Sequence, residues 1–124
     1  MIPRIEKLAT ILLVEDNLAD VRLMKEALRE SQYVAKLLVT YDGDEAMNFL
    51  RHEEGFENSP RPDLILLDLN LPKKDGREVL AELKSDKDLR RIPVIVMTVS
   101  KYEQDILEAY DLHANCYINK PVDF

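Results

Sequence analysis

The stretch from Pro62 to Gly76, PDLILLDLNLPKKDG, decides the fold of this chain. Leu64 to Leu67 form an unbroken apolar run that ends on a carboxylate, Asp68. Such runs are typical of a strand covered on both faces, as in a parallel sheet with helices on each side. In these sheets, sites form just outside the carboxyl ends of the strands, where Asp68 is expected. A carboxylate at that place can be a nucleophile, a metal ligand or a helix cap.

Five apolar runs alternate with amphipathic segments along the chain, which predicts an α/β fold with a parallel sheet. The expected strands are residues 11–14, 35–40, 64–67, 94–97 and 116–118. Apolar residues at helical spacing predict four helices, around residues 18–28, 46–50, 79–83 and 106–110. Helix starts are indicated by Ser100 with Glu103, a capping box, and by two similar pairs, Asp75 with Glu78 and Asp42 with Glu45.

Length and composition predict one domain, residues 1–124, with a core of ordinary size, because 46% of the 124 residues are hydrophobic. We expect a cytoplasmic protein, since no apolar run is long enough for a membrane helix and the N-terminus does not resemble a signal peptide. The single cysteine, Cys116, excludes an internal disulfide and is expected as a small buried hydrophobic residue. A net charge of −7 argues against direct binding to nucleic acid.

Acidic and polar residues follow four of the five expected strands. Glu15 and Asp16 follow the first strand, and they lie close to Asp68 if the first and third strands are adjacent. Three neighbouring carboxylates repel one another unless a cation joins them or their pKa values rise. An open site of oxygen ligands favours Mg²⁺ over Ca²⁺. With Thr98 and Lys120 at the next two strand ends, the set indicates a site for phosphoryl transfer to an aspartate.

Each of these residues also has an ordinary structural role to consider. Asp16 or Asn17 alone is more often a helix cap than a ligand, Thr98 alone is a β-branched strand residue, and Lys120 alone is a solvated lysine. Their joint occurrence at successive strand ends favours the functional interpretation.

The same residues carry a resemblance to a known family, the receiver domain of two-component response regulators. The resemblance covers residues 10–121, in order and spacing, through VEDN (14–17), LLDLNLP (66–72), DG (75–76), VMT (96–98) and KP (120–121). The segments LDLNLPKKDGREVL (67–80) and LHANCY (112–117) most resemble the single-domain receivers that serve phytochrome-type sensor histidine kinases.

The resemblance implies a flavodoxin-like, doubly wound, five-stranded parallel sheet with strand order 2-1-3-4-5. Phe124 follows shortly after the fifth expected strand, so the fifth helix of the family is expected to be absent from this chain. A sheet face left uncovered in this way would be a contact site. A receiver domain without an output domain is expected.

The resemblance also assigns the phosphoacceptor and its metal. Asp68 would accept the phosphoryl group. Asp16 and Asp68 would bind Mg²⁺ by their side chains and Asn70 by its backbone carbonyl, with Glu15 acting directly or through water.

The remaining roles fall near the ends of the fourth and fifth strands. Lys120 would pair with the phosphoryl oxygens and Thr98 would hydrogen-bond one of them. Tyr117 matches the family's switch aromatic, which turns inward as Thr98 moves. Val99 is bulkier than the small residue common at its position, and together with Asn70 and Ser100 it is expected to tune the phosphate lifetime. Slowed self-dephosphorylation is the expected result.

The implied function is that of a two-component response regulator receiver, a signalling domain and not an enzyme, although it promotes its own phosphorylation and dephosphorylation. It would take a phosphoryl group from a sensor histidine kinase in a phytochrome-type phosphorelay and signal through its last-strand face. That face could contact a second copy or a downstream protein. No nucleic acid or membrane is expected as a partner.

Three other functions fit parts of the same pattern. A haloacid dehalogenase-type phosphatase needs a second acid two residues after its nucleophile, where this chain has Asn70. A flavin carrier needs a hydroxyl- or glycine-rich phosphate loop after the first strand, where this chain has Glu15 and Asp16. A receiver-like scaffold that is never phosphorylated is disfavoured, because all the groups for phosphorylation are present.

Overall fold

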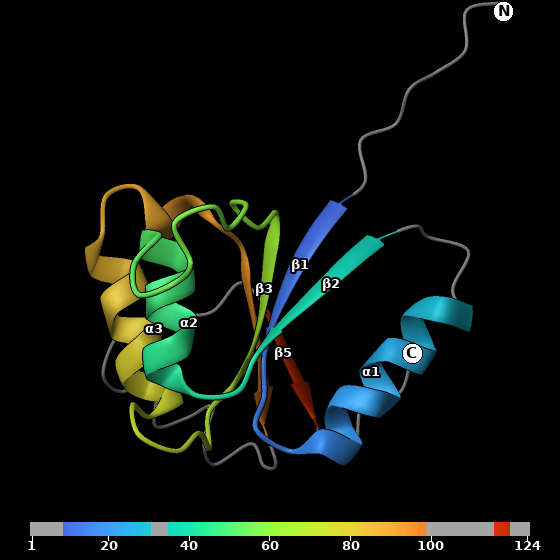
Figure 1. The fold of residues 1–124 in the computed structure, drawn as a ribbon. Coiled ribbons are helices and arrows are strands. Elements are labelled where there is room, and N and C mark those ends of the chain that lie inside the picture. The colour runs from blue at the N-terminus through green and yellow to red at the C-terminus, as the bar shows by residue number, and fades with distance from the viewer. Residues whose placement is uncertain (1–8, 31–34, 99–115, 120–124) are drawn as a thin grey trace, which may run out of the picture.

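A computed structural model describes residues 9–30, 35–98 and 116–119 of the chain. These residues contain five parallel strands in one sheet, in the order β2-β1-β3-β4-β5 (Figure 1). The strands are β1 (Ala9–Val14), β2 (Ala35–Thr40), β3 (Leu64–Asp68), β4 (Val94–Thr98) and β5 (Cys116–Asn119). The helices are α1 (Leu18–Glu30), α2 (Gly43–Arg51), α3 (Gly76–Ser85) and a short 3-10 helix, η1 (Leu89–Arg91). The predicted α/β class and strand order are confirmed.

Helices cover both faces of the sheet, with α2 and α3 on one face and α1 on the other (Figure 1). Alternate residues of one strand serve the two faces, because successive side chains of a strand point in opposite directions. Leu67 packs with α2 and α3, whereas Leu66 packs with α1. The buried apolar runs in the sequence therefore reflect strands covered on both sides, as expected.

Four of the five strands extend beyond their predicted apolar runs. β1 begins at Ala9, two residues before its predicted start, because Ala9 and Thr10 pair with the first residues of β2. Asp63 also binds the backbone of Thr10. The Asp63 carboxylate accepts the Thr10 N–H at 2.8 Å, and the Asp63 N–H donates to the Thr10 carbonyl at 2.7 Å. β3, β4 and β5 each end one residue later than predicted, at Asp68, Thr98 and Asn119, whereas β2 keeps its predicted bounds. The helix predicted around residues 106–110 and the cap at Ser100 lie outside the described residues.

Two of the predicted helix caps are present. The Asp42 side chain accepts the Glu45 N–H at 2.7 Å and caps α2, as the spacing indicated. Asp75 caps α3, but its carboxylate accepts the Arg77 N–H at 2.7 Å, one residue earlier than the Asp75–Glu78 pattern implies. Both helices therefore begin where a carboxylate replaces the missing backbone acceptor.

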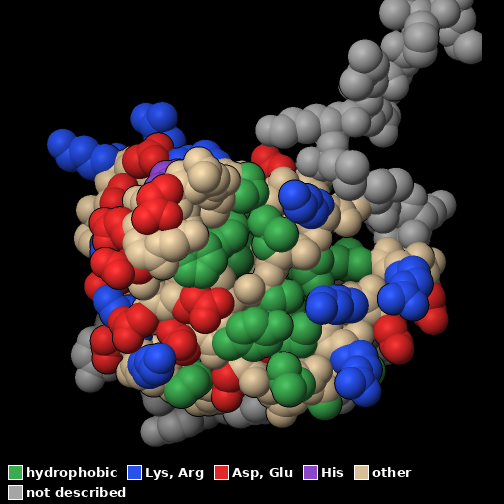
Figure 2. All heavy atoms as spheres, viewed as in Figure 1, with side chains coloured by type: hydrophobic (Ala, Val, Ile, Leu, Met, Phe, Trp, Pro, Cys, Tyr) green, Lys and Arg blue, Asp and Glu red, His purple; other side chains and the backbone are tan. Residues whose placement is uncertain are grey.

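The face shown in Figure 2 has hydrophobic side chains along its middle, between α2 and α1, where β2 forms an edge of the sheet. Leu37, Leu38 and Val39 of β2 are only partly buried. Acidic side chains gather on the side of α2. Among the described residues, no helix combines the length and apolar character that crossing a membrane requires.

Candidate functional site

Strand register brings the predicted carboxylates together at one edge of the sheet. Val14 at the end of β1 pairs with Leu67 of β3, so Glu15 and Asp68 follow at the same level. The carboxylate oxygens of Glu15, Asp16 and Asp68 all lie within 4.8 Å of one another. The sequence prediction that these three acids meet is therefore confirmed in position.

The three carboxylates differ in exposure. Glu15 and Asp68 are only 1% and 3% exposed, whereas Asp16 is exposed. Two buried carboxylates beside an exposed one form a site that is open to solvent on one side. This donor set fits a hard divalent cation, because such cations prefer carboxylate oxygens and often keep part of their water shell.

Backbone amides fix the two buried carboxylates. The Asn17 N–H donates to Glu15 Oε1 at 3.1 Å, and the Asn70 N–H donates to Asp68 Oδ1 at 3.1 Å. The Glu15 N–H in turn donates to the Thr40 carbonyl at the end of β2 at 3.0 Å. Each acid is thus oriented by the loop that follows it. Hydrogen bonds of this kind stabilise the charged carboxylate.

Asn17, and not Asp16, caps the first helix. Its side-chain oxygen accepts the Ala19 N–H at 2.9 Å and the Asp20 N–H at 3.2 Å. The sequence alone left both residues open as caps. Because Asn17 takes this structural role, the carboxylate of Asp16 can face the other two acids.

Gly76 packs against the backbone of Asp68 and Leu69, a role that the sequence prediction did not assign. A Cβ placed on Gly76 would lie 2.3 Å from the Asp68 carbonyl oxygen and 2.5 Å from the Leu69 Cα. Its N–H donates to the Leu69 carbonyl at 3.0 Å. Helix α3 therefore begins in direct contact with the backbone of Asp68. The signal for it in the sequence is a glycine directly after a helix-capping aspartate.

The other predicted site residues are described only in part. Thr98 is the last residue of β4. The pairing of β3 with β4 sets Asp68 opposite Met97, which directly precedes Thr98. The backbone of Tyr117 lies in β5, paired with Val96. Asn70 is exposed in the loop after Asp68. Val99, Ser100 and Lys120 lie outside the described residues, as do the side chains of Thr98 and Tyr117.

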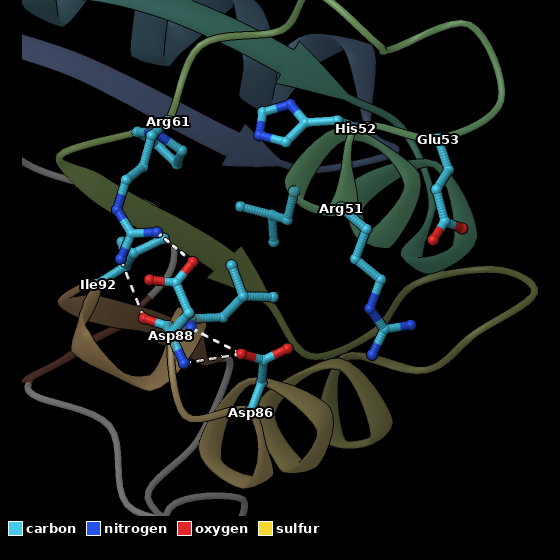
Figure 3. Close-up of a pocket in the computed structure, with 10 residues that line it drawn as sticks. Arg51, His52, Glu53, Arg61, Asp86, Asp88 and Ile92 are labelled. Atoms are coloured by element: carbon cyan, nitrogen blue, oxygen red, sulfur yellow. Dashed lines mark hydrogen bonds and ion pairs between the residues drawn. The ribbon is translucent and has the colours of Figure 1, made fainter.

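A pocket of about 430 Å³ opens at the opposite end of the strands (Figure 3). Arg61 holds Asp88 there, with one guanidinium nitrogen 2.8 Å from the carboxylate and another 3.0 Å from the Asp88 carbonyl. The backbone N–H groups of Leu89 and then Asp88 hold the pKa of Asp86 below its ordinary value of 3.8. These charged groups bind one another and nearby backbone, so they hold the loops around η1 in place.

The comparison with known families matches residues 11–124 to the response regulator receiver domain. The chain therefore belongs to the receiver domain family of response regulators. It is similar to the response regulator Rcp1 of Synechocystis sp. (strain PCC 6803 / Kazusa), with 58% identity over 110 residues, or 89% of this chain and 75% of that protein.

Solved structures agree with this assignment. The structure of the phosphorylated cyanobacterial phytochrome response regulator RcpA is 57% identical, with a TM-score of 0.84, and the match covers 94% of this chain and 84% of that one. A Mn²⁺-bound form of Rcp1 is 55% identical with the same TM-score and coverage. The chain is a receiver domain close to phytochrome response regulators, as the resemblance predicted.

Proposed function

We propose that this chain accepts a phosphoryl group on Asp68 from a sensor histidine kinase in a Mg²⁺-dependent reaction. The observation that carries the proposal is the cluster of Glu15, Asp16 and Asp68, whose oxygens lie within 4.8 Å at the end of a central strand. In a receiver domain, this is the arrangement that would combine a metal site with a nucleophile.

The metal would be held by the side chains of Asp16 and Asp68 and by the Asn70 carbonyl, with Glu15 bound directly or through water. Bound Mg²⁺ supplies charge neutralisation for the phosphoryl oxygens. The exposed position of Asp16 leaves one side of the cluster accessible to such an ion and to its remaining water.

The chemical step is a nucleophilic substitution at phosphorus. An Asp68 oxygen forms a new P–O bond while the P–N bond of the kinase phosphohistidine breaks. The histidine nitrogen keeps the bonding electrons and takes a proton from solvent, and the product is an acyl phosphate on Asp68. The hydrogen bond from the Asn70 N–H holds the carboxylate in one orientation, which lowers the entropic cost of the step.

The signal would leave through β4 and β5. Thr98 ends β4 beside the site, and Tyr117 lies on the neighbouring strand. Thr98 would bond the phosphoryl group as Tyr117 turns inward, with Lys120 pairing its charge. Val99, Asn70 and Ser100 would set the lifetime of the phosphate. The last-strand face would then change its affinity for a second copy or for a downstream protein.

A phytochrome-type kinase is the proposed phosphoryl donor, in the cytoplasm. Support comes from the similarity to response regulators whose descriptions name phytochrome. Transfer from a phytochrome-type kinase should be much faster than transfer from an unrelated histidine kinase, and equal rates would contradict the assignment of the partner.

The phosphoacceptor can be tested by intact mass after incubation with acetyl phosphate, with and without Mg²⁺. The wild-type protein should gain one phosphoryl adduct only with Mg²⁺, and Asp68→Asn should gain none. Asp88→Asn is the matched control, because Asp88 lies at the opposite end of the strands. An adduct on folded Asp68→Asn, or none on the wild type, would overturn the proposal.

A further inference from the structure

The loop between β3 and α3, residues 69–75, is fastened to the start of α2 by direct backbone contact. A Cβ on Gly43 would lie 2.0 Å from the Lys74 carbonyl oxygen and 2.7 Å from the Lys74 Cβ. Gly43 is the first residue of α2 and is buried. Only glycine allows this approach, because every other side chain would force the loop away from the helix.

Two ion pairs fasten the same loop to both neighbouring helices. Lys73 Nζ lies 3.5 Å from Asp42 Oδ2 at the cap of α2, and Lys74 Nζ lies 2.5 Å from Glu82 Oε1 on α3. Lys74 and Glu82 are only 21% and 32% exposed, so water screens this pair incompletely. Lys73 is 67% exposed, so its pair with the more buried Asp42 is the weaker of the two.

The backbone of Lys73 is itself held in an uncommon conformation. Its φ of 62° lies in the left-handed region, which a lysine adopts only when its surroundings require it. The start of α2 supplies negative charge for its side chain. The pKa of Glu45 there is raised above its ordinary value, first by burial and second by the charge of Asp42. The charge of Lys73 acts in the opposite direction and is the smaller effect.

The loop held in this way is also the loop that orients the phosphoacceptor. It begins directly after Asp68, and its Asn70 N–H donates to Asp68 Oδ1. At its other end, the Gly76 N–H donates to the Leu69 carbonyl. The backbone of Asn70 is therefore fixed by Asp68 on one side and by the contacts of Lys73 and Lys74 on the other.

We propose that the start of α2, through Gly43 and Asp42, positions the loop after Asp68 and thereby sets the affinity of the acidic cluster for divalent metal. Gly43 and Asp42 are positioning residues, since neither belongs to the three carboxylates of the cluster. This inference rests on the proposed function, because it assumes that Asn70 and the acidic cluster hold the metal.

The test compares Gly43→Ala with the wild type by calorimetric titration with Mg²⁺ and with Mn²⁺. The dissociation constant should rise about tenfold, as is common when a residue that supports metal ligands is changed. Gly55→Ala is the matched control, since Gly55 has a φ of 95° and no atom within 4 Å of an added Cβ. It should lose stability through backbone strain and keep its metal affinity.

A second variant keeps the test valid if Gly43→Ala does not fold. Asp42→Asn retains the oxygen that caps α2 and removes the charge that faces Lys73, so it should weaken metal binding by about two- to threefold. A second readout, amide NMR, needs no metal. The signals of Asn70 and Gly76 should shift in metal-free Gly43→Ala and Asp42→Asn, and they should stay unchanged in Gly55→Ala.

The outcomes separate the two proposals. If the wild type binds no metal, the proposed function fails, and the amide shifts alone decide whether α2 positions the loop. If the wild type binds metal and the folded variants bind it equally well, the positioning role is excluded even when their stability falls.

Discussion

At the carboxyl end of the strands, three carboxylates have oxygens within 4.8 Å of one another, whereas at the amino end the Asp88 carboxylate lies 2.8 Å from the Arg61 guanidinium. The first arrangement gathers like charges and the second pairs opposite ones. Two like charges about 4 Å apart repel by about 1 kcal/mol in water and about 4 kcal/mol near a protein surface. Gathering acids is therefore costly for the fold, and a ligand of opposite charge relieves that cost.

The comparison separates residues that serve binding from residues that serve structure. At the amino end, the charged groups that line the pocket hold η1 and the loop before β3. The acidic cluster instead concentrates one kind of ligand atom. For this receiver domain, the chemistry of the donor atoms is what supports the proposed metal site.

The largest expected effect concerns the close packing of Gly76 on the Asp68 backbone at the carboxyl end of the strands. Gly76→Ala places a methyl group 2.3 Å from the Asp68 carbonyl, where rigid backbone cannot move aside, so it should lower the free energy of unfolding by about 3 kcal/mol. Gly55→Ala, which meets no atom, should cost about 1–2 kcal/mol through its left-handed backbone. Urea unfolding measures both, and equal losses would contradict the tight contact at Gly76.

Removal of one acid tests the gathered charges. Asp16→Asn should weaken Mg²⁺ binding by about 10- to 100-fold, because an amide replaces a charged ligand. Mg²⁺ should raise the thermal midpoint of the wild type and not that of the variant, since a ligand that binds only the folded state stabilises it. Asp88→Asn should keep the full metal effect, and losing it there would break the contrast between the two ends.

The ion pair at the amino end should contribute little. Arg61 and Asp88 are 45% and 72% exposed, and exposed pairs contribute about 0.2–1 kcal/mol. A double-mutant cycle with Arg61→Ala and Asp88→Ala measures the coupling by urea unfolding. A coupling above this range would show that the amino end, too, stores substantial electrostatic energy.

The smallest effect concerns Asp86. The N–H groups of Leu89 and Asp88 lower its pKa in the folded state, so its contribution to stability is complete above 3.8 and is lost as the pH falls through the lower folded value. Carboxyl NMR should show Asp86 titrating below 3.8, and in Leu89→Pro, which lacks the N–H, the value should move back towards it. Titration of the wild type at or above 3.8 would contradict the hydrogen bonds.

The sequence was sufficient to predict that Glu15, Asp16 and Asp68 meet, because they follow the ends of neighbouring strands. The run Leu64–Leu67 followed by Asp68 marks the end of a buried strand, and parallel pairing then determines that Glu15 lies beside it. Contacts between segments that are distant in the chain have no such pattern in the sequence, so they could not be predicted. The extension of β1 to Ala9 depends on pairing with the start of β2, and the close packing of Gly43 on Lys74 depends on where two segments meet.

Caps show the same limit at short range. The spacing of Asp42 and Glu45 correctly predicted the start of α2, because the relevant hydrogen bond joins residues that are three apart. Between Asp16 and Asn17 the sequence could not choose, since aspartate and asparagine are equally good helix caps. Only the direction of the chain after β1 shows that Asn17 takes the cap.

The central place of β3 in the sheet has a consequence for amide hydrogen exchange. β3 is hydrogen-bonded to β1 on one side and β4 on the other, whereas β2 is an edge strand. Amides in the middle of a sheet exchange only when large parts of the fold open, but those at an edge exchange through local fluctuations. We expect Leu66 and Leu67 to exchange among the slowest described residues, so the proposed phosphoacceptor, Asp68, directly follows one of the most protected segments of the sheet.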